Sequence, residues 1–332
     1  MGLPVTVYRW DDAGAPQLTT PKPSEIINIL QKCLVDGYGS KSPLGWTKEF
    51  EDVVSQKVAY RNSPTEGSGG YFQMWSHDGS NSANILMRLT SAVSMSGLDT
   101  FFNKSYNTGI HAYNSNFDRW VVIGTSRAFY LILSTNGVMG GNNSLYDSVA
   151  YVGDFDPFIP NDINTFITIG STSVNGDFTG TSLTSWSSCF HTAFRISSPP
   201  SSASTILLKL GGTDGSATMD DYGILVINNV FYTNPIQGVS DVNLGIYYPV
   251  LIAAHSVYPN SLYTSPDGAS YRQSQNYPLY RGKLAGMNCS MSPRCENLPW
   301  PVIQTDFGVD HWVMRSTGSV QGVVVNMVTW HE

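Results

Sequence analysis

Side chains that could bind a metal ion are few in this sequence and widely spaced. Cys189 and His191 are two residues apart on an expected strand, so both can face the same side of a sheet. Together with Cys289 and Cys295 they could in principle form a four-ligand zinc site. Their spacing matches no common zinc module, so we expect packed thiols and no bound zinc. Whether Cys289 and Cys295 pair stays open, because nothing else indicates an oxidising compartment.

Carboxylates on a loop are the ligands that calcium would need. The segment TDGSATMDDYG brings together Asp214, Asp220 and Asp221. The EF-hand pattern is absent and Asp-Gly usually forms a turn, so ion binding here stays open. Asp154 and Asp156, in GDFDPF, face one way on an extended chain. We expect them to cap a turn or bind backbone amides, and we expect no cofactor.

No set of residues indicates catalysis. The GxSxG motif is absent, and the six histidines occur in unrelated contexts. His77 lies in the polar turn SHDGS, whereas His111, His255 and His311 neighbour aromatic or apolar strand residues. A glycosidase needs only two carboxylates beside a groove, and 25 acidic residues supply such pairs by chance. We therefore expect a protein without enzymatic activity.

The composition excludes several classes of protein. Charged residues make up 13% of the chain, about half of the roughly 25% that is usual. A net charge of −7 without any Lys/Arg cluster argues against nucleic-acid binding. No apolar run approaches the roughly 20 residues that span a bilayer, and the N-terminus lacks a signal-peptide pattern. We therefore expect the protein to fold in a cytoplasm. A surface poor in charge and rich in Tyr and Trp is typical of a protein that belongs to an assembly. The alternative to an assembly component is an ordinary soluble β-rich domain.

A helix near residues 24–36 is the best-defined element that the sequence predicts. Ser24 is the expected N-cap, Glu25 places negative charge in the first turn, and Gly37 is the expected end. The spacing of its apolar residues predicts one buried face. This face contains Ile26, Ile27, Leu30, Cys33 and Leu34.

Strand and turn signals dominate the rest of the chain, which predicts a mainly β, antiparallel, sandwich-like body with an α+β N-terminus. The expected strands are residues 5–10, 57–61, 71–75, 84–90, 119–124, 127–133, 165–169, 187–196, 205–210, 223–227, 246–253, 311–316 and 322–330. Residues 97–110 could hold a second short helix. We expect an N-terminal docking part at 1–118 and a larger β part at 119–332, with a seam near 197–204; a single compact unit is the alternative.

Three motifs carry a resemblance to a known family. The loop DGYGSK…GWTK in residues 36–48 precedes a WVVIG…RAFYL hairpin with an expected turn at Thr125 and Ser126, and a GDF corner at Gly153 and Asp154. An RGKLAG turn follows at residues 281–286. This order resembles a family of tailed-bacteriophage virion structural proteins, most clearly over the first half of the chain.

The resemblance implies a structural component of the tail, baseplate or neck, assembled in the bacterial host cytoplasm and located in the virion. The alternative is a receptor-binding or glycan-cleaving fibre or tailspike module, although the stacked-rung periodicity of tailspikes is absent. We expect contacts with other virion proteins and with further copies of this chain, and none with nucleic acid or membrane. The expected contact residues are Tyr38, Lys41 and Trp46 in the first motif and Tyr258, Tyr263, Tyr271, Tyr277 and Tyr280 in Tyr-rich loops.

Overall fold

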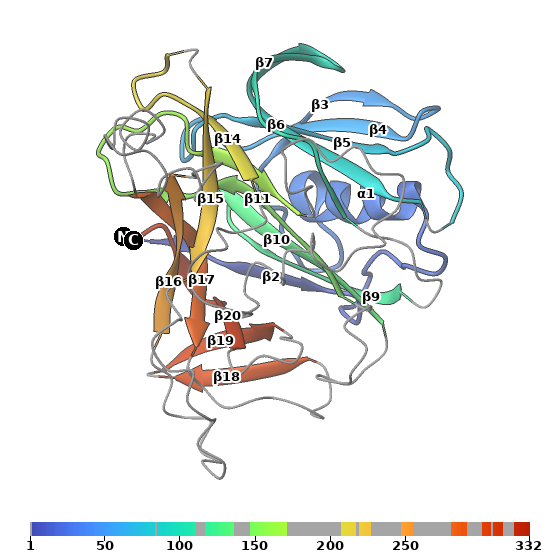
Figure 1. Ribbon diagram of the computed structural model, residues 1–332. Coiled ribbons are helices and arrows are strands. Elements are labelled where there is room, and N and C mark those ends of the chain that lie inside the picture. Colours follow the sequence, from blue (N-terminus) through green and yellow to red (C-terminus); the bar gives the residue numbers. More distant parts are fainter. Residues whose placement is uncertain are drawn as a thin grey trace, which may run out of the picture.

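Antiparallel strands are the main element of the described chain, as the sequence predicts, in a computed structural model with one helical segment near the N-terminus (Figure 1). The structure describes residues 2–83, 85–110, 117–135, 147–170, 207–216, 219–226, 247–254, 280–290, 301–306, 308–314 and 322–332.

The predicted helix is present as α1 (Pro23–Gln31), which continues into a π-helical segment, η1 (Lys32–Asp36). Its N-cap is Lys22, so the assignment of Ser24 as N-cap was wrong. Pro23 takes the first helical position, where its missing N–H has no intrahelical partner to lose. Gly37 ends the helical segment with a φ of 79°, as predicted.

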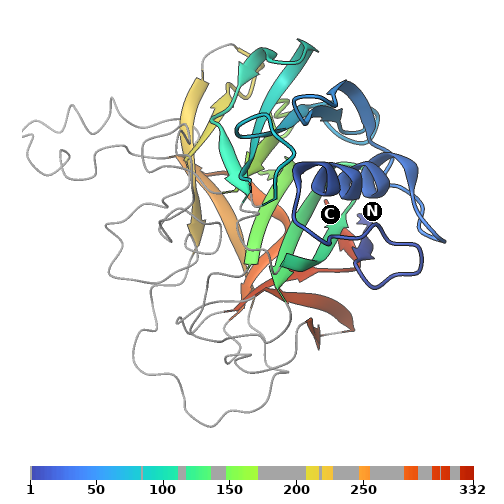
Figure 2. The same cartoon turned by 90° about the vertical axis from the view of Figure 1, so that its right-hand side faces the viewer.

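The first turn of the helix agrees with the prediction, and so does its apolar face, except that Ile27 is only partly buried and Ile29 is buried in its place. The Glu25 carboxylate accepts a hydrogen bond from the Thr20 amide at 3.1 Å. Buried residues of the face are Ile26, Ile29, Leu30, Cys33 and Leu34. They pack in one cluster with the strands on both sides of the helix. Seen from the side, α1 lies over the strands of the central sheet (Figure 2).

A five-stranded sheet forms the middle layer, in the order β13-β11-β10-β9-β2. Its strands are β2 (Thr6–Arg9), β9 (Phe117–Gly124), β10 (Ala128–Thr135), β11 (Asp147–Asp154) and β13 (Phe166–Ile169).

The central sheet is buried on both faces because its strands are apolar at consecutive positions. Val121 and Ile123 of β9 belong to one buried cluster, whereas Trp120 and Val122 belong to the other. Each cluster is completed by a different outer layer.

The first outer layer is a six-stranded sheet that packs with α1 against the middle layer. Its strands are β3 (Thr47–Asp52), β4 (Lys57–Arg61), β5 (Tyr71–Ser76), β6 (Met87–Gly97), β7 (Thr100–Lys104) and β8 (Thr108–Ile110). The possible helix at residues 97–110 is therefore wrong, because β7 and β8 both pair with β6.

The second outer layer is an eight-stranded sheet with the order β14-β15-β16-β17-β20-β19-β18, to which β12 adds by pairing with β17. Its strands are β12 (Asp156–Pro157), β14 (Leu207–Gly211), β15 (Met219–Val226), β16 (Tyr247–Ala254), β17 (Tyr280–Ser290), β18 (Val302–Asp306), β19 (Val309–Met314) and β20 (Gly322–Asn326).

Two turns differ from the prediction. The RGKLAG segment lies inside β17, and its second glycine marks a bulge. Gly286 has a φ of 67°, and it lies within the stretch of β17 where the pairing register with β16 shifts. The turn between β9 and β10 is centred on Ser126 and Arg127, one residue later than expected, because the Thr125 amide already bonds to the Ala128 carbonyl.

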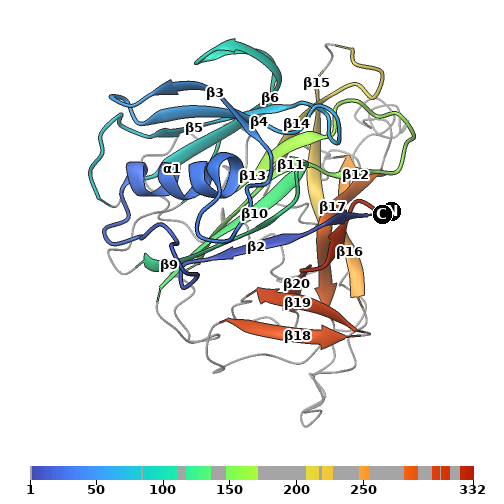
Figure 3. The ribbon, with the colours of Figure 1, turned by 180° about the vertical axis from the view of Figure 1, so that it is seen from behind.

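The two chain ends lie side by side, where β1 (Leu3–Pro4) pairs with β21 (Thr329–Trp330), as seen from behind (Figure 3). The expected boundary between residues 118 and 119 falls inside β9, which pairs with β2. One buried cluster also contains residues from both sides of it. The division into two parts stays a prediction.

Candidate functional site

The loop that carries Tyr38 and Lys41 is bound to the chain's own central sheet. The Tyr38 hydroxyl donates to the Asp12 carboxylate at 2.8 Å, and the same carboxylate accepts the Arg9 amide at 2.8 Å. The Lys41 ammonium donates to the Val7 carbonyl at 2.8 Å. Because β2 is an edge strand, these bonds satisfy main-chain groups that would otherwise be open to another strand.

Burial of the Tyr38 side chain has an electrostatic consequence. Loss of solvent, and next the hydrogen bond to Asp12, raise the pKa of its hydroxyl above the ordinary value for tyrosine. The phenol therefore stays protonated and remains a donor to Asp12. The ring packs against Tyr8 and Trp120, with centroid distances of 5.9 and 6.1 Å.

Trp46, from the GWTK part of the same motif, lies in the core with 2% of its surface exposed. Its indole N–H donates to the Thr125 carbonyl at 3.2 Å. Its ring contacts Phe72, Phe129 and Phe166, with centroid distances of 5.3–5.9 Å. The motif therefore joins the six-stranded sheet to the β9–β10 hairpin.

The π-helical segment explains how this loop is held. The Leu44 amide donates to the Cys33 carbonyl at 2.9 Å, and the Trp46 amide donates to the Leu34 carbonyl at 3.0 Å. Carbonyl groups in the last turn of a helix lack intrahelical partners, so the returning chain satisfies them. Helix, loop and hairpin form one unit.

The GDF corner holds a buried carboxylate. Asp154 accepts hydrogen bonds from the Ser68 amide at 2.8 Å, the Asn62 side chain at 2.9 Å and the Thr165 hydroxyl at 3.0 Å. The Arg127 guanidinium lies 3.6 Å away and offsets the charge. The expectation of backbone-amide binding holds for Asp154 through the Ser68 amide, whereas Asp156 contacts the His331 imidazole at 2.6 Å.

A second buried charge pair joins β17 to the segment before β13. Arg281 donates two hydrogen bonds to Asp162, at 2.8 and 2.9 Å, and both side chains are buried. The guanidinium also lies 5.3 Å from the centre of the Tyr222 ring. The arginine of the RGKLAG motif is therefore one partner of a buried ion pair.

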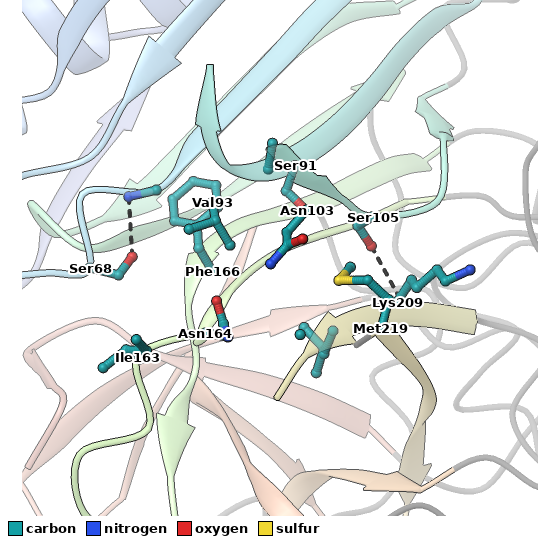
Figure 4. Close-up of a pocket in the computed structure, with 14 residues that line it drawn as sticks. Ser68, Ser91, Val93, Asn103, Ser105, Ile163, Asn164, Phe166, Lys209 and Met219 are labelled. Carbon is teal, nitrogen blue, oxygen red and sulfur yellow. Dashed lines mark hydrogen bonds between the residues drawn. The ribbon is translucent and has the colours of Figure 1, made fainter. Parts of the chain in front are cut away.

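A small cavity opens where the three sheets meet (Figure 4). It encloses about 20 Å³, room for roughly one water molecule. Its polar lining includes Ser91, Asn103, Ser105 and Asn164, while the stem of Lys209 forms one wall.

The expected contact tyrosines divide into two groups. Tyr280, at the start of β17, is 47% exposed. Tyr258, Tyr263, Tyr271 and Tyr277 lie outside the described residues. In the first motif Tyr38 and Trp46 are buried and Lys41 is half-buried, so Tyr280 is the exposed one among the expected contact residues that the structure describes.

The metal-site residues lie mostly outside the described chain, which excludes Cys189, His191, Cys295 and the side chain of Cys289. Asp214 accepts the Ser216 amide at 2.9 Å, which is a turn contact. Within the described residues no three His, Cys, Asp or Glu side chains gather as metal ligands would.

The histidines that the structure describes contact other side chains of the chain, and His331 lies 2.6 Å from the Asp156 carboxylate. His77 accepts a hydrogen bond from Arg88 at 2.8 Å, and burial followed by the Arg88 charge lowers its pKa. His311 stacks on Tyr247 with a centroid distance of 4.9 Å. His111 and His255 lie outside the described residues.

Sequence reasoning missed the polar residues Asn62 and Ser68, which bond to the Asp154 carboxylate at the GDF corner. The signal that could have found them is an asparagine or serine in a loop rich in Gly, Pro and Ser, since such residues bond to nearby backbone. A comparison with known protein families finds no match, and one with curated proteins finds none either. Among the described residues, no helix has the length and apolar character to cross a membrane.

Proposed function

We propose that this chain is a non-enzymatic structural component of a tailed-bacteriophage particle, in the tail, baseplate or neck. It acts through contacts with other virion proteins and with further copies of itself. It is assembled in the cytoplasm of the bacterial host and becomes part of the virion.

The observation that supports this proposal is the meeting of the three family-like motifs in one buried unit. Trp46 of the loop bonds to Thr125 of the hairpin at 3.2 Å. Arg127 of the same hairpin accepts the Asp154 amide of the corner at 3.1 Å. Residues far apart in sequence thus specify one scaffold, as expected if the resemblance reflects a shared fold.

Exposed apolar side chains on the surface also support a role in protein–protein contacts. Phe158 and Ile163 are 51% and 58% exposed, and Tyr280 lies close to them in the fold. The segments that carry these three residues are joined by the Phe158 amide, which bonds to the Arg281 carbonyl at 2.9 Å, and by the Arg281–Asp162 pair. Exposed apolar side chains on rigidly joined segments suit a protein–protein contact.

Mass spectrometry of purified particles tests the proposal, followed by immunogold labelling to place the chain. We expect the protein among the virion components and no hydrolase activity in the purified chain. Its absence from particles, together with binding of the isolated protein to cells or glycan, would favour the receptor-binding alternative.

The contact surface is tested by replacing Phe158 and Tyr280 with Ser. We expect lower incorporation into particles and an unchanged melting transition, because the two side chains are 51% and 47% exposed. Val328→Ser is the matched control, since Val328 is similarly exposed at 45% but lies near the chain ends. Equal incorporation of both variants would place the contact elsewhere.

A further inference from the structure

The cavity between the sheets lies where three edge strands meet. β7, β13 and β14 are the last strands of the six-, five- and eight-stranded sheets. Asn103 of β7, Phe166 of β13 and Lys209 of β14 line the space. An edge strand leaves main-chain groups unpaired, so the meeting point of three edges needs polar partners.

Two amide atoms in this cavity lack a partner. Asn164 is 4% exposed, and its Oδ1 atom is buried without a hydrogen bond. Its Nδ2 atom donates to the Gly212 carbonyl, which fixes the oxygen as the atom that faces the cavity. The Asn103 Nδ2 atom is also buried without a partner. Figure 4 shows the Asn103 nitrogen and the Asn164 oxygen pointing into the same space.

One charged residue, Lys209, lines the cavity, and its ammonium group is engaged elsewhere, so the occupant is neutral. The Lys209 ammonium lies 5.3 Å from the centre of the Tyr106 ring. A neutral occupant must accept one hydrogen bond from an amide N–H and donate one to an amide oxygen.

We propose that one ordered water molecule binds in this cavity, between Asn103 Nδ2 and Asn164 Oδ1. A volume of about 20 Å³ accommodates one water molecule, and a buried water typically makes about three hydrogen bonds. The further partner is a hydroxyl group, since Ser91 and Ser105 both line the cavity. Buried polar groups are rarely left unpaired, which is the physical reason for the site.

This water completes the cover of the β14 edge. The Lys209 amide already donates to the Ser105 hydroxyl at 3.2 Å, and the Gly212 carbonyl accepts from Asn164. The water links Asn164 to Asn103 on β7 and so connects the six-stranded sheet to the eight-stranded sheet. The water site does not depend on the proposed function of the protein.

A high-resolution crystal structure of the full chain is the first test. We expect one density peak within hydrogen-bond distance of Asn103 Nδ2 and Asn164 Oδ1. An empty cavity, a direct bond between the two amides, or a cation with short oxygen contacts would overturn the proposal. This measurement on the unaltered protein does not depend on any variant folding.

Asn103→Gly is the second test, with Asn161→Gly as the matched control. Both asparagines have positive φ, 49° and 63°, so glycine relieves the backbone equally, but Asn161 is exposed. We expect loss of the water peak and a lower melting temperature for Asn103→Gly alone. Retention of the water at full occupancy, or equal melting temperatures, would show that Asn103 does not hold it.

Discussion

Replacement of Trp46 tests whether the GWTK motif belongs to the core or to a partner interface. Trp46 is 2% exposed, contacts three phenylalanine rings and donates to the Thr125 carbonyl. A buried side chain of this kind stabilises the chain that contains it, with or without a partner. We therefore expect Trp46→Ala to destabilise the isolated protein.

The expected magnitude follows from these contacts. Removing a buried tryptophan to alanine costs about 3–5 kcal/mol, including the cavity that remains. Trp46→Phe keeps a ring against Phe72, Phe129 and Phe166, where each aromatic contact contributes roughly 0.5–1.5 kcal/mol. It leaves the buried Thr125 carbonyl without its donor, a loss of about 1–3 kcal/mol. The phenylalanine variant should therefore be the more stable of the two.

Urea denaturation measures the difference in unfolding free energy between the variants. Unfolding is monitored by far-ultraviolet circular dichroism, because replacing a tryptophan changes the tryptophan fluorescence itself. Trp75→Ala is the control, since Trp75 is only partly buried on β5. The comparison rests on the denaturation midpoint at an unchanged slope.

A loss below about 1 kcal/mol for Trp46→Ala would refute the argument, because surface changes have effects of about half that size. The same small loss together with failed incorporation into particles would restore the partner-contact hypothesis. If Trp46→Ala and Trp75→Ala caused the same large loss of unfolding free energy, Trp46 would be no more important to the core than Trp75.

Three further predictions concern the helix, the buried ion pair and the response to pH. Leu30→Ala should cost about 2–5 kcal/mol of unfolding free energy by denaturation, because Leu30 is fully buried; a loss under about half a kcal/mol would mean an exposed face. Asp162→Ala should cost about 3–5 kcal/mol of unfolding free energy, since it leaves the buried Arg281 charge without a partner. The double variant Asp162→Leu with Arg281→Met should recover much of this stability, because it removes both buried charges. A double variant as unstable as Asp162→Ala would contradict this prediction. Burial raises the pKa of Tyr130 and Tyr151 well above the ordinary value for tyrosine. The unfolded chain therefore releases these protons first, and stability should fall as the pH rises above about 10. Urea titrations from neutral to high pH check the slope, and a constant midpoint would count against it.

The sequence by itself determined the elements whose signal is local. The spacing of Ile26, Leu30 and Leu34 predicts a buried helical face, and Gly37 predicts its end; the structure confirms both. The strand at Lys57–Arg61 agrees residue for residue with β4. Such patterns depend on periodicity and backbone preference, which neighbouring residues express without help from the rest of the fold.

Tertiary structure alone decided which residues meet. RGKLAG reads locally as a turn, yet β16 and β20 on either side make it part of β17, with the glycine absorbed as a bulge. Tyr38 and Trp46 were expected as contact residues of a loop, and loops are usually exposed, yet hydrogen bonds to the helix end and to the β2 edge hold their loop against the core.

The same reason explains why the cavity was not predicted. Asn103 and Asn164 are 61 residues apart in sequence, and they share a space only because the edges of different sheets converge. Pairing between distant strands is set by long-range packing energy, which no local pattern encodes. Composition and periodicity therefore determined the class of fold, whereas the packing of three sheets decided the sites.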